Sequence, residues 1–177
     1  MAFVAGQKLR VSDLDGGTGG GSGSTAGGGV SRASADVTVN NTTTFTDTGL
    51  QLSVVANAVY AVRAWIRYNT GNTPDIKFQW STPSGTTGYW SLVGHGRDVT
   101  TAAVDVSAGA TFVVEDIGTS KTVAGDATGT LLLACVAGGE LTTTTAGTVK
   151  LRVAQRTANA SNTVFRTGSR MELVRIA

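Results

Sequence analysis

Hydrophobic and polar residues alternate over several stretches of the chain, which is the pattern of β-strands with one buried face. The clearest stretch is residues 58–69. One face of it carries Tyr60, Val62, Ala64, Ile66 and Tyr68, and the other carries Arg63, Trp65 and Arg67. A second strand is expected between Pro74 and Pro83, because proline lacks the amide hydrogen that a sheet interior needs. Its apolar face carries Ile76, Phe78 and Trp80. We expect these two strands to form the aromatic centre of the core.

Further short strands are expected elsewhere, separated mostly by glycine-bearing breaks. They cover residues 37–40, 50–55, 89–93, 99–106, 110–115, 129–136, 148–155 and 170–176. Residues 137–140, Ala-Gly-Gly-Glu, are the best candidate for a tight hairpin, because consecutive glycines can adopt the positive φ values of such turns. No stretch shows the apolar period of a helix, so the sequence predicts an all-β fold, a jelly-roll-like antiparallel β-sandwich.

Two segments of different character precede this domain. Residues 16–29 hold nine glycines in fourteen positions, and a flexible coil of that length spans about 20 Å. Residues 1–15 are too few to fold alone, yet they carry several large apolar side chains. We therefore expect an extended docking peptide at 1–15, a flexible Gly/Ser-rich linker at 16–34 and the β-sandwich at 35–177. A disordered leader, or a strand that folds back onto the sandwich, are the alternatives.

The docking peptide is expected to bind a partner surface through two kinds of contact. Lys8 and Arg10 would steer it electrostatically. The apolar contacts would come from Phe3, Val4, Leu9, Val11 and Leu14.

Composition narrows the classes of function. A formal net charge of +2 with 15% charged residues does not suggest electrostatic attachment to nucleic acid or to anionic lipid. One cysteine cannot form an intrachain disulfide, and no cluster of Cys and His offers a zinc site. The longest apolar run is far shorter than a membrane helix, and residues 1–15 lack the apolar core of a signal peptide. We expect a soluble protein without metal or cofactor, made in the cytoplasm.

Few residues suggest catalysis. His95, the only histidine, lies between glycines, and no Gly-x-Ser-x-Gly elbow accompanies it. Cys135 lies in an apolar run, where burial would raise the thiol pKa. Glu115 and Asp116 are the most plausible carboxylate pair, but neighbouring strand residues point to opposite faces. Other acids match no calcium-binding loop: Asp75, Asp98, Asp105, Asp126 and Glu140. The sequence therefore predicts no enzymatic activity.

Two surface features suggest binding instead. Tyr89 and Trp90 follow a glycine-flanked turn and form a possible ligand platform for a sugar or a base, unless Trp90 packs inward. The end of the chain is basic, and we expect a solvated outer face there, with contact to an acidic partner as the alternative. Its charged residues are Lys150, Arg152, Arg156, Arg166, Arg170 and Arg175, against the single acid Glu172.

The opening FVAGQKLRVSDLD, the glycine-rich tract and the Thr- and Val-rich β domain together resemble virion structural proteins of tailed bacteriophages, in particular those infecting actinobacteria. In those proteins a peptide of the pattern F-V-x-G-Q-x-L-x-x-x-D-L precedes a β-sandwich. The pattern is matched by Phe3, Val4, Gly6, Gln7, Leu9, Asp13 and Leu14. The main domain adds three similar stretches, which are residues 73–78 with Trp80, 158–163 and 168–176.

This resemblance implies a non-enzymatic capsid decoration protein, head fibre or minor tail protein on the surface of the virion head or tail. Its partners would be the major capsid or tail proteins and further copies of itself, with a trimer favoured because closed head-to-tail contacts form rings. Two rivals remain open. One is a minor tail protein that binds a host receptor or cell-surface glycan, and the other is a polysaccharide-cleaving enzyme that uses acidic residues.

Overall fold

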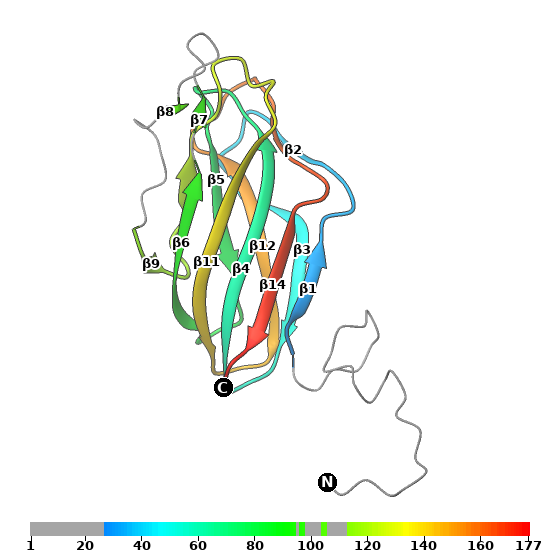
Figure 1. Ribbon diagram of the computed structural model, residues 1–177, viewed down its shortest axis with the longest axis vertical. Coiled ribbons are helices and arrows are strands. Elements are labelled where there is room, and N and C mark those ends of the chain that lie inside the picture. Colours follow the sequence, from blue (N-terminus) through cyan, green and yellow to red (C-terminus); the bar gives the residue numbers. More distant parts are fainter. Residues whose placement is uncertain (1–26, 95, 98–103, 106–112) are drawn as a thin grey trace, which may run out of the picture.

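The computed structural model describes residues 27–94, 96–97, 104–105 and 113–177. In these ranges the chain is all-β, and two antiparallel sheets pack face to face as a sandwich (Figure 1). The first sheet runs in the order β1 (Gly29–Arg32), β14 (Arg170–Arg175), β4 (Ala58–Asn69), β11 (Leu133–Thr143), β6 (Thr87–Gly94), β9 (Glu115–Asp116), and β13 (Thr163–Phe165) joins β4 to β2 (Val37–Val39). The second sheet runs in the order β10 (Lys121–Val123), β5 (Ile76–Ser81), β12 (Gly147–Gln155), β3 (Thr46–Val54). A separate pair joins β7 (Gly96–Arg97) to β8 (Val104–Asp105).

The strand order is that of a jelly roll, which confirms the predicted fold class. Of the eight principal strands, β1, β4, β11 and β14 lie in the first sheet and β3, β5, β10 and β12 in the second, and the chain crosses between the sheets at every step except from β5 to β10. Their spatial orders, β1-β14-β4-β11 and β3-β12-β5-β10, are the two sheets of an eight-stranded jelly roll. Strands β6 and β9 are an addition beyond β11, inserted in the chain between β5 and β10.

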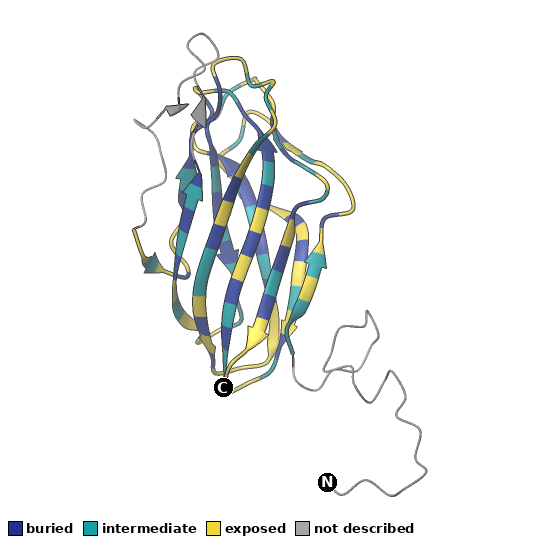
Figure 2. Cartoon of the chain, viewed as in Figure 1, coloured by how far each residue is buried: buried dark blue, intermediate teal, exposed yellow. Residues whose placement is uncertain are grey.

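The core lies between the sheets, and the predicted alternation of β4 is confirmed by its burial. Tyr60, Ile66 and Tyr68 are fully buried, whereas Arg63 and Trp65 on the opposite face are exposed (Figure 2). The predicted aromatic centre forms across the sandwich, since β4 and β5 belong to different sheets. The ring of Tyr68 meets Phe78 edge to face at 6.4 Å between centroids, and Trp80 meets Trp90 in the same way at 5.9 Å.

The predicted hairpin at residues 137–140 is wrong. These residues lie in the middle of β11, which pairs with β4 on one side and β6 on the other. A Cβ on Gly139 would lie 2.2 Å from the carbonyl oxygen of Tyr89 and 2.8 Å from Cα of Trp90 on β6. Glycine is therefore needed there because the backbone of β6 at Tyr89 and Trp90 lies close to the strand, and not because the chain turns.

The predicted boundary between linker and sandwich is also wrong, because residues 27–34 belong to the folded domain. Strand β1 pairs with β14, and the Gly28 amide donates a hydrogen bond of 2.7 Å to the carbonyl of Ser53 in β3. Gly28 has a φ of 87°, and a Cβ there would lie 2.6 Å from the Leu173 carbonyl oxygen. Close approach to two strands thus explains the last glycines of the tract.

The other predicted strands match the observed strands to different degrees. The stretches 37–40, 148–155 and 170–176 correspond closely to β2, β12 and β14. The stretches 50–55, 89–93 and 129–136 overlap the longer β3, β6 and β11. Most of 99–106 and 110–115 lies outside the described residues, apart from β8 and the start of β9. The three-residue strands β10 and β13 were not predicted.

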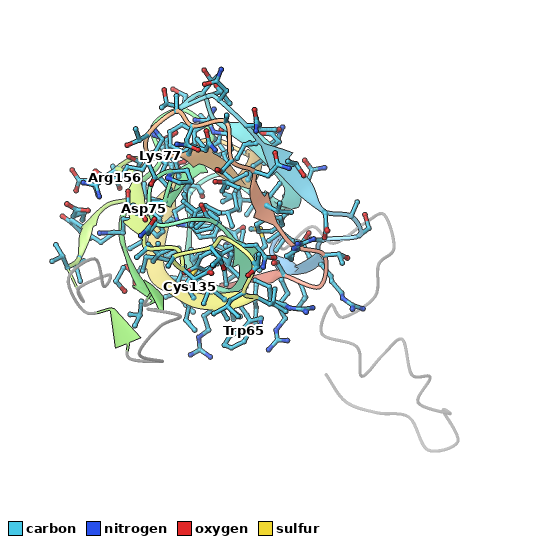
Figure 3. The ribbon with its side chains drawn as sticks, turned by 90° about the horizontal axis from the view of Figure 1, so that it is seen from above. Trp65, Asp75, Lys77, Cys135 and Arg156 are labelled. Atoms are coloured by element: carbon cyan, nitrogen blue, oxygen red, sulfur yellow. The ribbon has the colours of Figure 1, made fainter. Side chains whose placement is uncertain are left out.

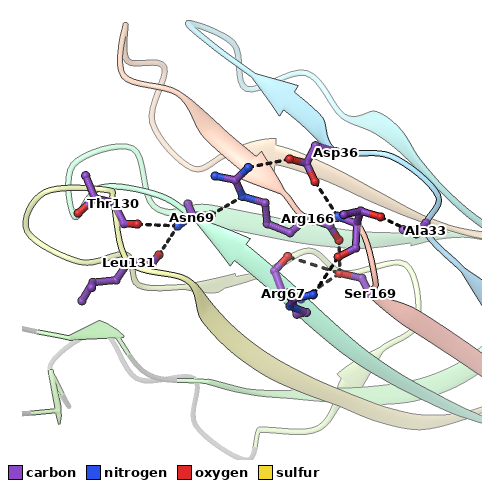
Figure 4. A network of polar contacts seen from close by, with 9 residues as sticks. Ala33, Asp36, Arg67, Asn69, Thr130, Leu131, Arg166 and Ser169 are labelled. Atoms are coloured by element: carbon purple, nitrogen blue, oxygen red, sulfur yellow. Dashed lines mark hydrogen bonds and ion pairs between the residues drawn. The ribbon is translucent and has the colours of Figure 1, made fainter.

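A polar network ties the β13–β14 connection to β4 and to the chain after β1 (Figure 4). Asp36 accepts a 2.7 Å hydrogen bond from the Thr167 amide and pairs with Arg166 at 2.6 Å. Arg166 also donates to the Asn69 side chain, whose amide group donates to the Thr130 carbonyl at 3.0 Å. The hydroxyl of Ser169 accepts from the backbone amide of Arg67 at 3.0 Å. The network holds β14 beside β4 at the end of the sheet.

This network predicts a pH-dependent stability. The hydrogen bond from the Thr167 amide lowers the pKa of Asp36 below its ordinary value of 3.8, and the hydrogen bond from Arg166 is the second cause. A lowered folded-state pKa stabilises the protein at higher pH, and the contribution is lost as the pH falls through that pKa. We expect Asp36→Asn to reduce the free energy of unfolding at pH 7 by less than about 1 kcal/mol, because the ion pair is partly exposed.

Urea unfolding of both proteins between about pH 7 and pH 2 measures this. The difference between wild type and Asp36→Asn should shrink below about pH 4, because the protonated Asp36 then resembles the asparagine. An equal difference at every pH would contradict the assignment.

Candidate functional site

Trp65 is the largest aromatic side chain on the outer face of the first sheet. It lies in the middle of β4 and is 41% exposed. Directly opposite it are Arg170 on β14 and Val136 on β11, and Val136 in turn lies opposite Val93 on β6. Viewed along the sandwich, Trp65 projects away from the sheets, whereas Cys135 lies between them (Figure 3).

Four arginines surround this tryptophan. Arg63 and Arg67 are two residues away on the same strand, so they share its outward face. Arg170 lies directly opposite Trp65, and Arg32 on β1 lies directly opposite Arg170. A Cβ added to Gly168 would meet both Arg67 Nη1, at 2.9 Å, and Arg32 Nη2, at 3.8 Å, so these two guanidinium groups converge. We call this set the Trp65 face, and it comprises Trp65, Val136, Gly138, Arg32, Arg63, Arg67 and Arg170.

No described acid lies within ion-pair distance of the arginines of the Trp65 face, and Asp36 interacts with Arg67 only at longer range. Within the part of the chain that the structure describes, Arg32, Arg63 and Arg170 form no ion pair. The Arg67 guanidinium donates to the Thr167 carbonyl at 3.3 Å. Glu172 lies opposite Arg63 in the register, but the two described side chains are not within ion-pair distance.

The outer face of the second sheet differs, because its cations are partnered. Lys150 pairs with Asp47 at 2.8 Å, and Arg152 donates to the Gln79 side chain at 2.6 Å. Lys77 and Arg152 also lie over the ring of Phe45, at 4.9 and 5.4 Å from its centroid. Exposure to solvent therefore does not by itself explain the unpaired arginines of the first sheet.

The predicted platform of Tyr89 and Trp90 does not form as a pair. These neighbours on β6 point to opposite faces, so Tyr89 is 60% exposed and Trp90 only 1%. Trp90 packs against Trp80, and its Nε1 donates to the Thr119 carbonyl at 3.1 Å. Its ring is thus closed to a ligand, while Tyr89 lies on the same outer face as Trp65, across β11 from it.

The candidate catalytic residues are not brought together. Cys135 is buried, and burial raises its pKa, as predicted. Glu115 pairs with Lys121 at 2.6 Å, whereas Asp116 is exposed. The described residues contain no group of three His, Cys, Asp or Glu side chains placed to hold a metal ion. His95, Asp98 and the docking residues Phe3, Val4, Lys8, Leu9, Arg10, Val11 and Leu14 lie outside the described residues.

One buried carboxylate stands apart from the Trp65 face. Asp126 is fully buried in the loop before β11; its Oδ2 accepts from the Thr128 amide and hydroxyl, and its Oδ1 has no described hydrogen-bond partner. Asp75 lies in the loop between β4 and β5, close to the loop that carries Asp126. It accepts a hydrogen bond of 3.2 Å from the Gly125 amide and pairs with Arg156 at 3.3 Å.

Sequence reasoning placed Trp65 on the outer face but did not identify it as part of a site. The available signal was the alternation Arg63-Ala-Trp65-Ile-Arg67. Arg32 and Arg170 could not be added to it, because only the pairing of β1, β14 and β4 brings them together.

No protein-family model matches the chain, and no curated protein matches its sequence. A structural likeness is found to the crystal structure of the infectious bursal disease virus VP2 subviral particle, with a TM-score of 0.22 and 8% identity. It covers 83% of this chain and 41% of that chain. A likeness of this size carries no argument about fold or function. No helix among the described residues is long and apolar enough to cross a membrane.

Proposed function

We propose that this chain is a non-enzymatic structural protein of a tailed-bacteriophage virion, a capsid decoration or head-fibre protein whose N-terminal peptide anchors an outward jelly roll. The proposal draws its phage context from the resemblance of residues 1–15 and of the three stretches in the main domain. The observation that carries it is the place where the chain enters the sandwich.

Both ends of the described domain lie at one end of the sandwich (Figure 1). The Gly28 amide is hydrogen-bonded to the carbonyl of Ser53, which lies near the end of β3 and shortly before β4 begins. At the start of β4, the amide of Val59 donates a 2.9 Å hydrogen bond to the Ala177 carbonyl. The loops that follow β4, β10 and β12 meet at the opposite end, where the Asp126 amide donates to the Thr70 carbonyl and the Arg156 amide to the Pro74 carbonyl. A peptide attached through residues 16–26 therefore holds the sandwich by one end and leaves the loop-bearing end and both outer faces free.

The proposed partners are the major capsid or tail proteins and further copies of this chain, with a trimer favoured. Several weak docking peptides on one oligomer bind a repeating lattice more tightly than one peptide, provided that the tethers span the sites. A flexible tether also lets an oligomer and a lattice of different symmetry join.

Deleting residues 1–15 is expected to leave folding and oligomeric state unchanged and to reduce incorporation into particles by at least about tenfold, because the docking contacts are gone. Incorporation is measured by complementing a phage that lacks the gene and quantifying the protein in purified particles. Urea unfolding and native mass measurement report fold and oligomer. Equal incorporation would overturn the anchoring role.

Two further variants sharpen this test. Replacing Phe3, Val4, Leu9, Val11 and Leu14 by serine keeps the leader but should abolish incorporation. Deleting residues 16–22 instead shortens only the glycine tract, and incorporation should persist.

A further inference from the structure

We propose that the Trp65 face binds an anionic polysaccharide, a linear glycan whose units carry carboxylate or phosphate groups. This inference adds a ligand to the sandwich and is tested on the purified protein, so its failure would leave the virion role standing.

The arrangement of charge is the first argument. Arg32 and Arg170 lie directly opposite one another, and like charges at opposed positions destabilise a sheet. Arg67 converges on Arg32 above Gly168, and no described acid forms an ion pair with these three residues. An anionic group placed between the guanidinium groups would remove their repulsion and accept charge-assisted hydrogen bonds from them.

The second argument is the exposed ring with cations on both sides of it. Arg63 and Arg67 are four residues apart on β4, about 13 Å between Cα atoms, and Trp65 lies midway between them. A sugar ring stacked on the indole would therefore place the neighbouring units of a linear chain near a guanidinium group on either side. Aromatic rings are well suited to this, because they combine a flat apolar face with low conformational entropy.

On β11, the outward-facing residues nearest Trp65 have small side chains or none. Val136 lies directly opposite Trp65, and Gly138 lies between Arg63 and Ser91 in the register. A Cβ on Gly138 would meet no atom within 4 Å, and its φ is not positive. Unlike Gly139, this glycine is not required by the packing of the sandwich, and it lets a ligand approach the backbone of β11.

Other ligands or partners suit the positive charge of the Trp65 face less well than an anionic polysaccharide does. A second copy bound by the same face would oppose arginines to arginines, because a two-fold interface is self-complementary. The leader at residues 1–15 carries Lys8 and Arg10 against Asp13 and Asp15, so it has no net negative charge. A single-stranded nucleic acid stacks successive bases on several aromatic rings, whereas the Trp65 face holds one and Tyr89 lies across β11 from it.

Binding is tested by titrating the full-length protein with four polymers. They are polygalacturonate, whose sugars carry carboxylates, phosphomannan, whose sugars carry phosphates, neutral dextran, and oligodeoxythymidylate. Tryptophan fluorescence is a selective readout, because Trp80 and Trp90 are buried and Trp65 is exposed. We expect one or both anionic polysaccharides to change the fluorescence and dextran not to. Raising the salt from about 0.05 to 0.3 M should weaken binding, since the charges are exposed.

Variants separate a binding role from a structural one. Trp65→Ala and Arg170→Gln should each weaken binding by about tenfold or more. Every variant is titrated by isothermal calorimetry, because Trp65→Ala removes the fluorescent reporter. Arg170→Gln should at the same time raise the melting temperature of the free protein by about 1–3 °C, because it removes the repulsion with Arg32. Matched controls are Tyr89→Ala, the other exposed aromatic of this sheet, and Arg175→Gln at the far end of β14. Both should bind within about twofold of wild type.

The outcomes are distinct. Binding by either anionic polysaccharide that is lost in Trp65→Ala supports the proposal, and the polysaccharide that binds identifies the anionic group. Equal binding of dextran, binding of oligodeoxythymidylate alone, a fluorescence change caused only by raising the protein concentration, or no binding by either anionic polysaccharide would each overturn it.

Discussion

Replacing Trp90 by alanine is expected to lower the free energy of unfolding by about 3–5 kcal/mol, the usual loss for a large aromatic removed from a core. Trp90 is fully buried, meets Trp80 edge to face and satisfies its Nε1 with the Thr119 carbonyl. Lys121 also lies over the ring, 5.6 Å from its centroid. The substitution therefore removes apolar burial and leaves a cavity between the two sheets. Urea or guanidinium unfolding followed by circular dichroism measures the loss.

The neighbouring residue provides the control. Tyr89→Ala should change the free energy of unfolding by less than about 0.5 kcal/mol, because its side chain is mostly exposed. If Tyr89→Ala were the more damaging of the two, the orientation of β6 would be opposite to that described.

Replacing Gly139 by alanine is expected to destabilise the protein by about 1–3 kcal/mol, occasionally more, because the added methyl group overlaps the Tyr89 carbonyl oxygen and Trp90. The same change at Gly138 is expected to be neutral or to stabilise by up to about 1 kcal/mol, since its Cβ would enter open space and alanine restricts the unfolded chain more than glycine does. The two variants differ by one position and have the same composition.

This pair distinguishes a strand from a turn. In a tight hairpin both glycines would adopt positive φ, and alanine would be unfavourable at each. In the middle of β11 the two residues point to opposite faces, and only the inward one is obstructed. Equal losses in denaturant unfolding at both positions would contradict the strand and restore the hairpin.

The proposed anchor and the proposed binding face occupy different parts of the molecule. The chain enters at the end of the sandwich where β4 begins, and Trp65 lies midway along β4 on the outer face. A tethered oligomer would therefore present several Trp65 faces at once, and weak binding at each would add up in avidity. Any variant of the Trp65 face is predicted to join particles normally.

Local information was sufficient for the elements of the core. Burial on one side of a strand imposes a period of two on consecutive residues, so the inward set of β4 from Tyr60 to Tyr68 could be identified without knowing its neighbours. The same applies to Ile76, Phe78 and Trp80 on β5 and to the burial of Cys135. Three residues are a weak signal for a strand, so β10 and β13 were missed although β2, which has the same length, was predicted.

Prediction from the local sequence failed where contact with a residue far away in the chain determines the residue type. Gly138 and Gly139 suggested a turn, but the reason for glycine at 139 is the β6 backbone at Trp90, almost fifty residues earlier in the chain. The glycines at 27–29 suggested a linker that continues to residue 34, but close contact with Ser53 and Leu173 places them in the domain. In both cases glycine accommodates a neighbouring backbone, which composition cannot distinguish from flexibility.

The amino-acid pattern alone established an all-β sandwich, the inward residues of its two central strands and a chemically distinct leader, because each of these follows from the order of neighbouring side chains. Only the tertiary structure decided that Arg32, Arg63, Arg67 and Arg170 surround Trp65 and that Trp90 is closed to ligands. The physical reason is strand register, which joins residues more than a hundred positions apart and is set by the packing of the whole sandwich.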